Sequence, residues 1–390
     1  MSKYEPNIHY CVGCGLCQAC SKAEIIVDDK GFYKPLTGDQ KWLKGICPIG
    51  NLPLEEYYHS SIWGRKEAVY YGWSNNDSLR ERASSGGILS EIAIFLLASQ
   101  VIDGVIHVCA NSDKPTENVT TLSYSIDEVI NKCGSRYSIS HPLNILHKLD
   151  NTKRYVFIGK PCDVIALRNY QKLNPDNKRI IPILLSFFCM GQPSKIAQIK
   201  LLKALNTDDN NCQQLIYRGN GWPGYATAVN KDGSFEKLDY NSSWGKILGR
   251  DLMPACKLCL DGIGEAADIS CGDAWYLTEK GTPDFSEHEG RNVVFARTKM
   301  GLDILSQMKK ANVITLEIID SPDMYLSQIQ KSQYLRRASM KSRIAALKLF
   351  RRNVPHYPKE MLKDFSRHLS MKDRLKVFIG TCKRILKGVM

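Results

Sequence analysis

Residues 154–170 read RYVFIGKPCDVIALRNY, and the prediction of the fold starts from this stretch. Its first six residues form a β-branched and aromatic run that is typical of a buried strand. Similar runs occur at 101–109 (VIDGVIHVC) and 180–189 (IIPILLSFFC), and helix-like stretches occupy 87–99 (GILSEIAIFLLAS) and 193–205 (PSKIAQIKLLKAL). Because strands alternate with helices, the sequence predicts an α/β core with a largely parallel sheet.

The composition is that of a folded protein. The chain has 390 residues, of which 43% are hydrophobic and 24% are charged, and these fractions exclude wholesale disorder and a polytopic membrane protein. The longest apolar stretches, around 88–97 and 180–190, fall short of the roughly 20 residues that span a bilayer. The N-terminal residues contain no apolar signal-peptide core, so we expect a cytoplasmic protein without a transmembrane helix.

The first cysteine group lies in CVGCGLCQAC (11–20), and the chain has 14 cysteines in all. A reducing compartment disfavours a disulfide framework, so metal or cluster ligation is the leading interpretation. Three cysteines in this spacing can wrap an iron–sulfur cube, and in bacterial ferredoxin modules a Cys-Pro supplies the fourth ligand. Cys47 is followed by proline, whereas Cys20 is followed by serine. We therefore assign one 4Fe–4S cluster to Cys11, Cys14, Cys17 and Cys47; a structural zinc site is the alternative.

A second cysteine group begins with the CxxC pair Cys256 and Cys259. Two thiolates cannot complete a site, but Cys162 follows one predicted strand and Cys189 ends another. Ligands of open α/β sheets gather outside the carboxyl ends of strands, so these thiols could converge with the CxxC loop. We predict a second 4Fe–4S cluster on Cys162, Cys189, Cys256 and Cys259. The alternative for Cys162 and Cys189 is burial as small hydrophobes, and Cys271 is a weaker candidate ligand.

Small residues open the predicted helix that begins near residue 87, in RASSGGILSEIAIFLL (82–97). They would let a phosphate approach free backbone N–H groups at the positive end of the helix. The alternative is that the Ser-Gly sequence only caps the helix. Two further segments, GSRYSIS (134–140) and YRGNGWPGY (217–225), add a guanidinium, hydroxyls and aromatic rings that could bind a flavin or its substrate.

The net charge of +13 comes entirely from residues 331–390, which contain 17 Lys and Arg and three acidic residues. A helical stripe there contains Leu375, Phe378, Ile379, Cys382, Ile385 and Leu386. Such a cationic amphipathic helix can lie on an anionic membrane surface, and the alternative is that its apolar stripe packs on the body of the protein. Nucleic-acid binding is not expected, because no recognised binding module accompanies the charge.

The order of the motifs resembles one family. CVGCGLC with a distant CP, then RASSGG, GSRYSIS, GKPCDVIALRNY, FFCMGQPS, RGNGWPG, CKLCLDGIGEAADISCGDAW and NVVFARTKMG span about residues 8–305. This order resembles the beta-subunit family of coenzyme F420 hydrogenases and dehydrogenases. It is also similar to plant 7-hydroxymethyl chlorophyll a reductases and to bacterial relatives found near polysaccharide-synthesis genes. The resemblance implies an FAD-binding α/β protein in which iron–sulfur clusters exchange electrons with the flavin.

The resemblance also implies particular residues. Flavin contacts are implied at Ser85, Gly86, Gly87, Ser135 and Arg136, and the GKPC, FFC and CKLC cysteines match an internal cluster. A proton donor is needed if a carbon–carbon bond or a carbonyl is reduced. Tyr137, Asp273 and His141 are candidates for it, and the sequence selects none of them.

These expectations combine into an α/β (α+β) organisation with four parts. Residues 1–55 form a ferredoxin-type 4Fe–4S module, 65–150 the N-terminal flavin-binding part, 151–325 a C-terminal part with the second cluster, and 331–390 a basic amphipathic helical tail.

The expected protein is an oxidoreductase with two 4Fe–4S clusters and FAD that acts on a CH–CH or CH–OH group. Its expected partners are ferredoxin or another redox protein, an organic substrate of which a lipid-linked compound is one candidate, and the inner membrane surface contacted peripherally through 331–390. One alternative is a non-catalytic electron-transfer subunit of a larger redox complex. Another is a zinc-stabilised basic adaptor that binds RNA or membrane.

Overall fold

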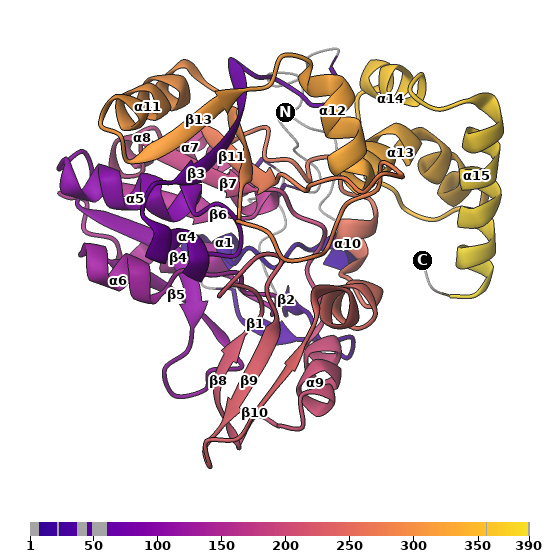
Figure 1. Cartoon of the computed structure of the whole chain (residues 1–390). Coiled ribbons are helices and arrows are strands. Elements are labelled where there is room, and N and C mark those ends of the chain that lie inside the picture. Colours follow the sequence, from indigo (N-terminus) through magenta and orange to yellow (C-terminus); the bar gives the residue numbers. More distant parts are fainter. Residues whose placement is uncertain (1–7, 22, 37–44, 49–60, 356, 389–390) are drawn as a thin grey trace.

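The computed structural model describes residues 8–21, 23–36, 45–48, 61–355 and 357–388 (Figure 1). An eight-stranded sheet forms its centre, in the order β13-β3-β12-β11-β7-β6-β4-β5. These strands are β3 (Ala68–Ser74), β4 (Gly104–Ala110), β5 (Asn118–Ser123), β6 (Tyr155–Gly159), β7 (Ile183–Phe187), β11 (Ile269–Asp273), β12 (Asn292–Ala296) and β13 (Ile314–Ile318). The predicted α/β class is confirmed.

The sheet is mixed, so the prediction of a largely parallel sheet is correct only for its centre. Strands β4, β6, β7 and β11 pair in parallel, whereas β5 on one side and β12, β3 and β13 on the other pair antiparallel. The reason lies in the connections. Parallel neighbours need a long crossover, whereas β4–β5 and β11–β12 are joined without a helix between them and can pair antiparallel.

Side chains alternate between the two faces of a strand, and both faces of the central strands carry apolar residues. Helices therefore cover both faces. Val156 of β6 lies in the apolar cluster shared with α5 (Ile88–Ala98) and α11 (Lys299–Lys310). The next residue, Phe157, lies in the cluster shared with α7 (Pro161–Leu173). The shorter helices are α4 (Asp77–Arg82), α6 (Ile126–Asn131), α8 (Asp176–Ile180), α10 (Pro254–Lys257), η2 (Pro142–Lys148), η3 (Asn241–Gly245) and η4 (Leu248–Arg250).

The N-terminal module packs against the α7 side of the sheet. It contains η1 (Ile8–Tyr10), α1 (Leu16–Ser21) and the antiparallel pair β1 (Ile25–Val27) and β2 (Tyr33–Pro35). Leu16 and Ile46 share one apolar cluster with Val164 of α7, so the described residues of this module share a core with the sheet domain. Residues 1–7, 22, 37–44 and 49–55 of the predicted module lie outside the described residues, and its boundaries stay a prediction.

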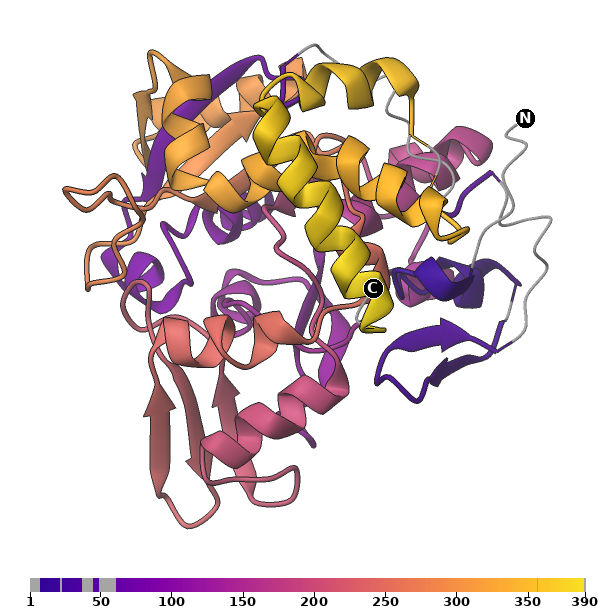
Figure 2. The same cartoon turned by 90° about the vertical axis from the view of Figure 1, so that its right-hand side faces the viewer.

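A second sheet of order β10-β9-β8 lies at one end of the molecule beside α9 (Lys195–Ala204) (Figure 1). Its strands are β8 (Cys212–Ile216), β9 (Ala226–Asn230) and β10 (Phe235–Leu238). At another side, the C-terminal residues form α12 (Pro322–Ile329), α13 (Lys331–Leu349), α14 (Lys359–Ser366) and α15 (Met371–Leu386) (Figure 2). None of the helices in the described ranges is long and apolar enough to cross a membrane.

Candidate functional site

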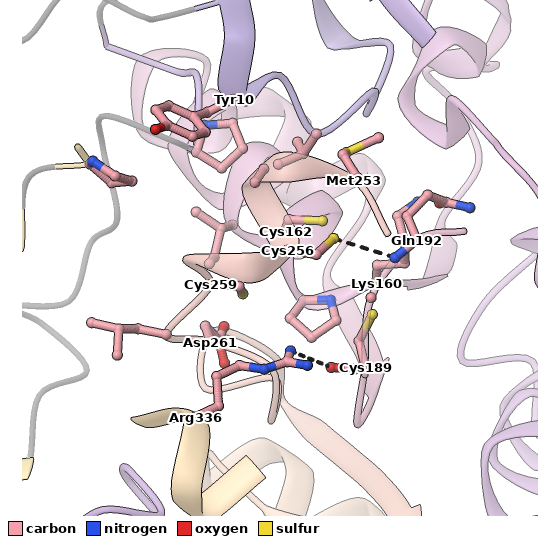
Figure 3. Close-up of a pocket in the computed structure, with 18 of the residues that line it drawn as sticks. Tyr10, Lys160, Cys162, Cys189, Gln192, Met253, Cys256, Cys259, Asp261 and Arg336 are labelled. Carbon is pink, nitrogen blue, oxygen red and sulfur yellow. Dashed lines mark hydrogen bonds between the residues drawn. The ribbon is translucent and has the colours of Figure 1, made fainter. Parts of the chain in front are cut away.

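Four cysteines from distant parts of the sequence line one cavity (Figure 3). Cys162 lies in the first turn of α7, directly after β6, and Cys189 lies two residues after β7. Cys256 lies in α10, and Cys259 follows that helix. Because β6 and β7 are parallel neighbours, the residues that follow them reach the same edge of the sheet. Cys271 instead packs in the apolar cluster beneath α5.

Backbone hydrogen bonds fasten the CxxC loop to the end of β7. The amide of Cys189 donates to the carbonyl of Gly262 over 2.8 Å. The amide of Gln192 donates to Cys256 Sγ over 3.3 Å. The amide of Gly191 donates to the sulfur of Cys189. Such donors stabilise negative charge on sulfur, which suits thiolate ligands of a metal or cluster.

The four cavity cysteines are half-buried, and removal of their thiols from water raises the pKa of each. The pKa of Cys189 rises to about 11. The pKa of Cys162 is raised well above its ordinary value, first by burial and then by the neighbouring Asp163. These thiols favour the neutral form until a cation compensates the charge of the thiolates, and ligation to iron supplies that kind of compensation.

A buried ion pair lies beside the cavity. Lys160 Nζ is 2.9 Å from Asp163 Oδ2, and Lys160 lines the cavity with the four cysteines (Figure 3). Burial opposes a charge on Lys160, but Asp163 and the thiol of Cys162 outweigh burial and raise the pKa of this lysine. A positive charge is therefore held next to the cysteines.

The cysteines of the N-terminal module also lie within electrostatic reach of one another. Thiolates at Cys17 and Cys47 disfavour a charge on Cys11, and Cys11 and Cys17 do the same for Cys14. Burial is the largest cause of the raised pKa values, which reach about 12 for Cys11. The amide of Gly13 donates to Cys11 Sγ over 3.4 Å. The structure thus places the four cysteines that the Cys-Pro pattern selects within electrostatic range of one another. Among the described residues, no three metal-ligating side chains are close enough together to hold a metal ion, and ligation of a cluster by these cysteines stays a prediction.

Cys20 lies within electrostatic reach of Cys17 but also has a side-chain partner on α7. Its thiol forms a hydrogen bond with the hydroxyl of Tyr170, a residue of α7. Burial is the largest cause of its pKa of about 11. This contact gives Cys20 a packing partner outside the group.

The two cysteine groups adjoin. Tyr10, Val12 and Pro48 of the N-terminal module line the cavity that holds the second group. After burial, the carboxylate of Asp163, next to Cys162, is the largest cause of the raised pKa of Cys14. Redox centres bound at the two groups would therefore be neighbours.

Side chains of helix α13 form hydrogen bonds with the loop that follows β7 and carries Cys189. Arg336 Nη2 donates to the carbonyl of Met190 over 2.6 Å, and Gln333 Nε2 donates to the carbonyl of Cys189 over 2.8 Å. Arg336 also lines the cavity. Both residues lie in 331–390, the segment that the sequence pattern predicts as a tail and not as part of a site. The contact of Arg336 with Met190 joins residues 146 positions apart, so no local pattern indicates it.

The three segments predicted to contact a flavin meet in the structure. The amide of Ser135 donates to Ser84 Oγ over 2.7 Å, and Ser84 Oγ donates to the carbonyl of Arg218 over 3.2 Å. One hydroxyl therefore joins the segment before α5, the segment before η2 and the loop after β8. This convergence is the feature that a shared ligand of these segments would require.

The turn before α5 has structural contacts of its own. Ser85 Oγ donates to the carbonyl of Arg291 over 2.9 Å. A Cβ on Gly86 would lie 2.7 Å from the carbonyl oxygen of Gly72, so the close packing of this turn on β3 requires glycine. Gly87 caps α5 with a φ of 79°. Contact of these three residues with a flavin stays a prediction.

Arg136 belongs to the framework around this turn. Its guanidinium donates to the carbonyl of Leu215 over 2.8 Å, to the carbonyl of Pro115 over 2.7 Å and to Asn118 Oδ1 over 2.9 Å. Protein oxygens thus satisfy the guanidinium of Arg136, so the position of this arginine requires no bound ligand. Its predicted contact with a flavin is untested.

The three candidate proton donors lie in different surroundings. Both oxygens of Asp273 accept from Arg218, at 2.9 and 3.0 Å, so this carboxylate is held in an ion pair. Tyr137 packs on Trp244. Burial, then the charge of Lys160, lowers the pKa of His141, and its Nδ1 has no hydrogen-bond partner among the residues described.

Comparisons with known proteins identify relatives. Residues 69–147 match the family model described as coenzyme F420 hydrogenase/dehydrogenase, beta subunit N-term, and residues 152–322 match the model of its C terminus. The coenzyme F420 hydrogenase subunit beta of Methanococcus voltae is 25% identical over 288 residues, which are 69% of this chain and 90% of the relative. The subunit of the same name from Methanosarcina barkeri is 28% identical over 60% of this chain and 76% of the relative.

Two further similarities extend the comparison. The 7-hydroxymethyl chlorophyll a reductase of Oryza sativa is 26% identical over 77% of this chain and 61% of that protein. A chain from the F420-reducing [NiFe] hydrogenase complex of Methanosarcina barkeri has a similar fold, with a TM-score of 0.55 at 20% identity. The match covers 74% of this chain and 96% of that chain.

The contacts of α13 generate the first testable prediction. Replacing Arg336→Leu removes charge-assisted hydrogen bonds from the loop that follows β7, so amide hydrogens of residues 188–192 should exchange at least about tenfold faster. Hydrogen–deuterium exchange with mass spectrometry measures this. Lys341→Leu, an exposed change on the same helix, is the control. Equal exchange in the two variants would show that Arg336 does not hold the loop.

Proposed function

Because the chain belongs to the coenzyme F420 hydrogenase/dehydrogenase beta-subunit family, we propose that it is an iron–sulfur flavoprotein oxidoreductase. In this proposal one 4Fe–4S cluster is held by Cys11, Cys14, Cys17 and Cys47. A second is held by Cys162, Cys189, Cys256 and Cys259. The observation that carries the proposal is that the four cysteines of the second set line one cavity, whose wall also includes residues of the N-terminal module. The cysteines of the first set lie within electrostatic range of one another.

The side chains and amides around the cavity suit this role. Backbone amides donate to cysteine sulfurs, which stabilises thiolates and influences the reduction potential of a bound cluster. The apolar walls formed by Val12, Ile165 and Leu260 keep water from the sulfurs. The ammonium of Lys160 adds a positive charge that favours an added electron.

FAD is the second cofactor of the proposal. A flavin exchanges a hydride with an organic compound and exchanges single electrons with clusters. The three segments joined through Ser84 support a shared flavin site, in which Ser85, Gly86, Gly87 and Ser135 contact the cofactor. The substrate class proposed is an organic compound with a CH–CH or CH–OH group, and ferredoxin or another redox protein exchanges electrons with the chain.

A non-catalytic electron-transfer subunit is the second candidate function. Two of the relatives are named as beta subunits of a hydrogenase, and such a subunit works within a larger assembly. Turnover of an organic substrate by the isolated chain with an artificial electron donor would favour the enzyme. Reduction of a partner protein alone would favour the relay.

The metal content of cysteine variants tests the proposal. The anaerobically purified protein should contain about eight irons and about one flavin per chain. Cys14→Ala and Cys189→Ala should each retain about four irons, because each removes a ligand of a different cluster. Elemental analysis with an absorption spectrum measures both cofactors, and Cys382→Ser is the control. Zinc in place of iron, or the full iron content in either alanine variant, would refute the ligand assignment.

The ion pair beside the cavity predicts that removal of its positive or its negative member shifts the reduction potential of the second cluster in opposite directions. Reduction adds negative charge to a cluster, so Lys160→Met should lower the reduction potential of the second cluster and Asp163→Asn should raise it. Each shift should be roughly 100 mV for a charge at close range in a partly polar interior. Spectroscopic redox titration of iron-replete variants measures this, with exposed Lys310→Met as the control. Shifts of the same sign in both variants would contradict the electrostatic argument.

A further inference from the structure

Helix α15 lies on the outside of the molecule (Figure 2), and four of its apolar side chains form an exposed stripe. Met371 and Leu386 are 76% and 74% exposed, and Leu375 and Ile379 are 58% and 45% exposed. Their spacing places them along one helical face. The inward face carries the buried Thr381 and Ile385, so Ile385 of the predicted stripe packs on the body of the protein. The four exposed residues are not the ones that attach the helix to the protein.

A row of lysines flanks this stripe. Three lysines each follow a stripe residue by one position, namely Lys372, Lys376 and Lys387. Lys383 lies seven residues after Lys376, so helical geometry places all four on the same side of the stripe. All four are exposed. Asp373 is the one acid in α15, and its carboxylate is 3.7 Å from Lys376. The flank therefore has a positive charge over the whole length of the helix.

The helix is formed before any partner binds. Ser370 caps its N-terminus by accepting from the amide of Asp373 over 3.1 Å. Its inward face packs on α13. A partner of the stripe therefore has no helix to order, and association avoids that loss of conformational entropy.

We propose that α15 docks the protein on the surface of an anionic lipid bilayer. The stripe enters the boundary between headgroups and acyl chains, and the lysine row contacts the phosphates. A lipid surface matches both features at once, because it offers apolar depth and negative charge along a plane. Nucleic acid offers phosphate charge, but it gives Met371, Leu375 and Ile379 no apolar surface to enter.

The docking surface lies one helix away from the candidate cluster site. α15 packs on α13, and α13 contributes Arg336 to the cavity of the second cysteine group. The proposal does not depend on the proposed redox function, because it rests on α15 alone. Because α13 contributes Arg336 to the cavity, removal of residues 331–390 would disturb the candidate cluster site as well. The test therefore uses substitutions on α15 in the full chain.

Co-sedimentation of the full chain with vesicles tests the proposal. Phosphatidylcholine vesicles with and without phosphatidylglycerol are compared at low and high salt. The protein should bind only the anionic vesicles, and high salt should weaken binding. Lys372→Gln with Lys383→Gln should weaken it roughly 30-fold, and Leu375→Gln with Ile379→Gln by at least about tenfold.

Matched controls separate docking from general charge and apolarity. Leu173→Gln changes a leucine that is 60% exposed on α7, and Lys299→Gln with Lys310→Gln removes two exposed lysines from α11. Both controls should bind as the unchanged protein does. Three results would each overturn the proposal: no binding to anionic vesicles, equal binding by the α15 variants and the controls, or sedimentation without vesicles that the α15 variants abolish. The last result would assign the stripe to a second copy of the chain.

Discussion

The parallel pairing of β6 with β7 is the constraint on which the candidate site depends. The pairing joins Phe157 to Leu184 and Gly159 to Ser186, so both strands end at the same edge of the sheet. Cys162 and Cys189 follow directly, and the CxxC loop reaches them through the hydrogen bond from Cys189 to Gly262. The position of the cavity is therefore a consequence of sheet topology, and the loops add the remaining thiols to a place that the sheet has already defined.

The removal of the cysteine thiols from water determines how readily they ionise. A buried thiol resists ionisation, and each group of four supplies negative charge that iron can compensate. The N-terminal module and α13 close the cavity from different directions, with Tyr10 and Arg336 both in its wall. Segments that lie more than 300 residues apart thus share one site, and the C-terminal region is part of it.

Short sequence patterns correctly predicted the secondary-structure class and the cysteines of the cavity, because both depend mainly on nearby residues. The strand-and-helix alternation predicted the α/β core. The CxxC pattern together with two strand ends predicted the four cysteines that line the cavity. The antiparallel flanks of the sheet were missed because periodicity does not reveal strand direction. The role of α13 was missed because the bond from Arg336 to Met190 depends on the complete fold. Arg136 lies in a motif that suggested a ligand contact, but its guanidinium donates to protein carbonyls. Its place in the motif is therefore not enough to assign it to a ligand.

The most direct test of the account is the electron paramagnetic resonance spectrum of the fully reduced protein. The central claim is that two clusters occupy adjoining sites, and neighbouring reduced clusters interact magnetically. The account predicts broadened and split signals that give way to one simple cluster spectrum when Cys14 is replaced by alanine. Two independent signals that add without interaction would contradict the claim that the sites adjoin, and a spectrum of one cluster in the unchanged protein would contradict the assignment of two.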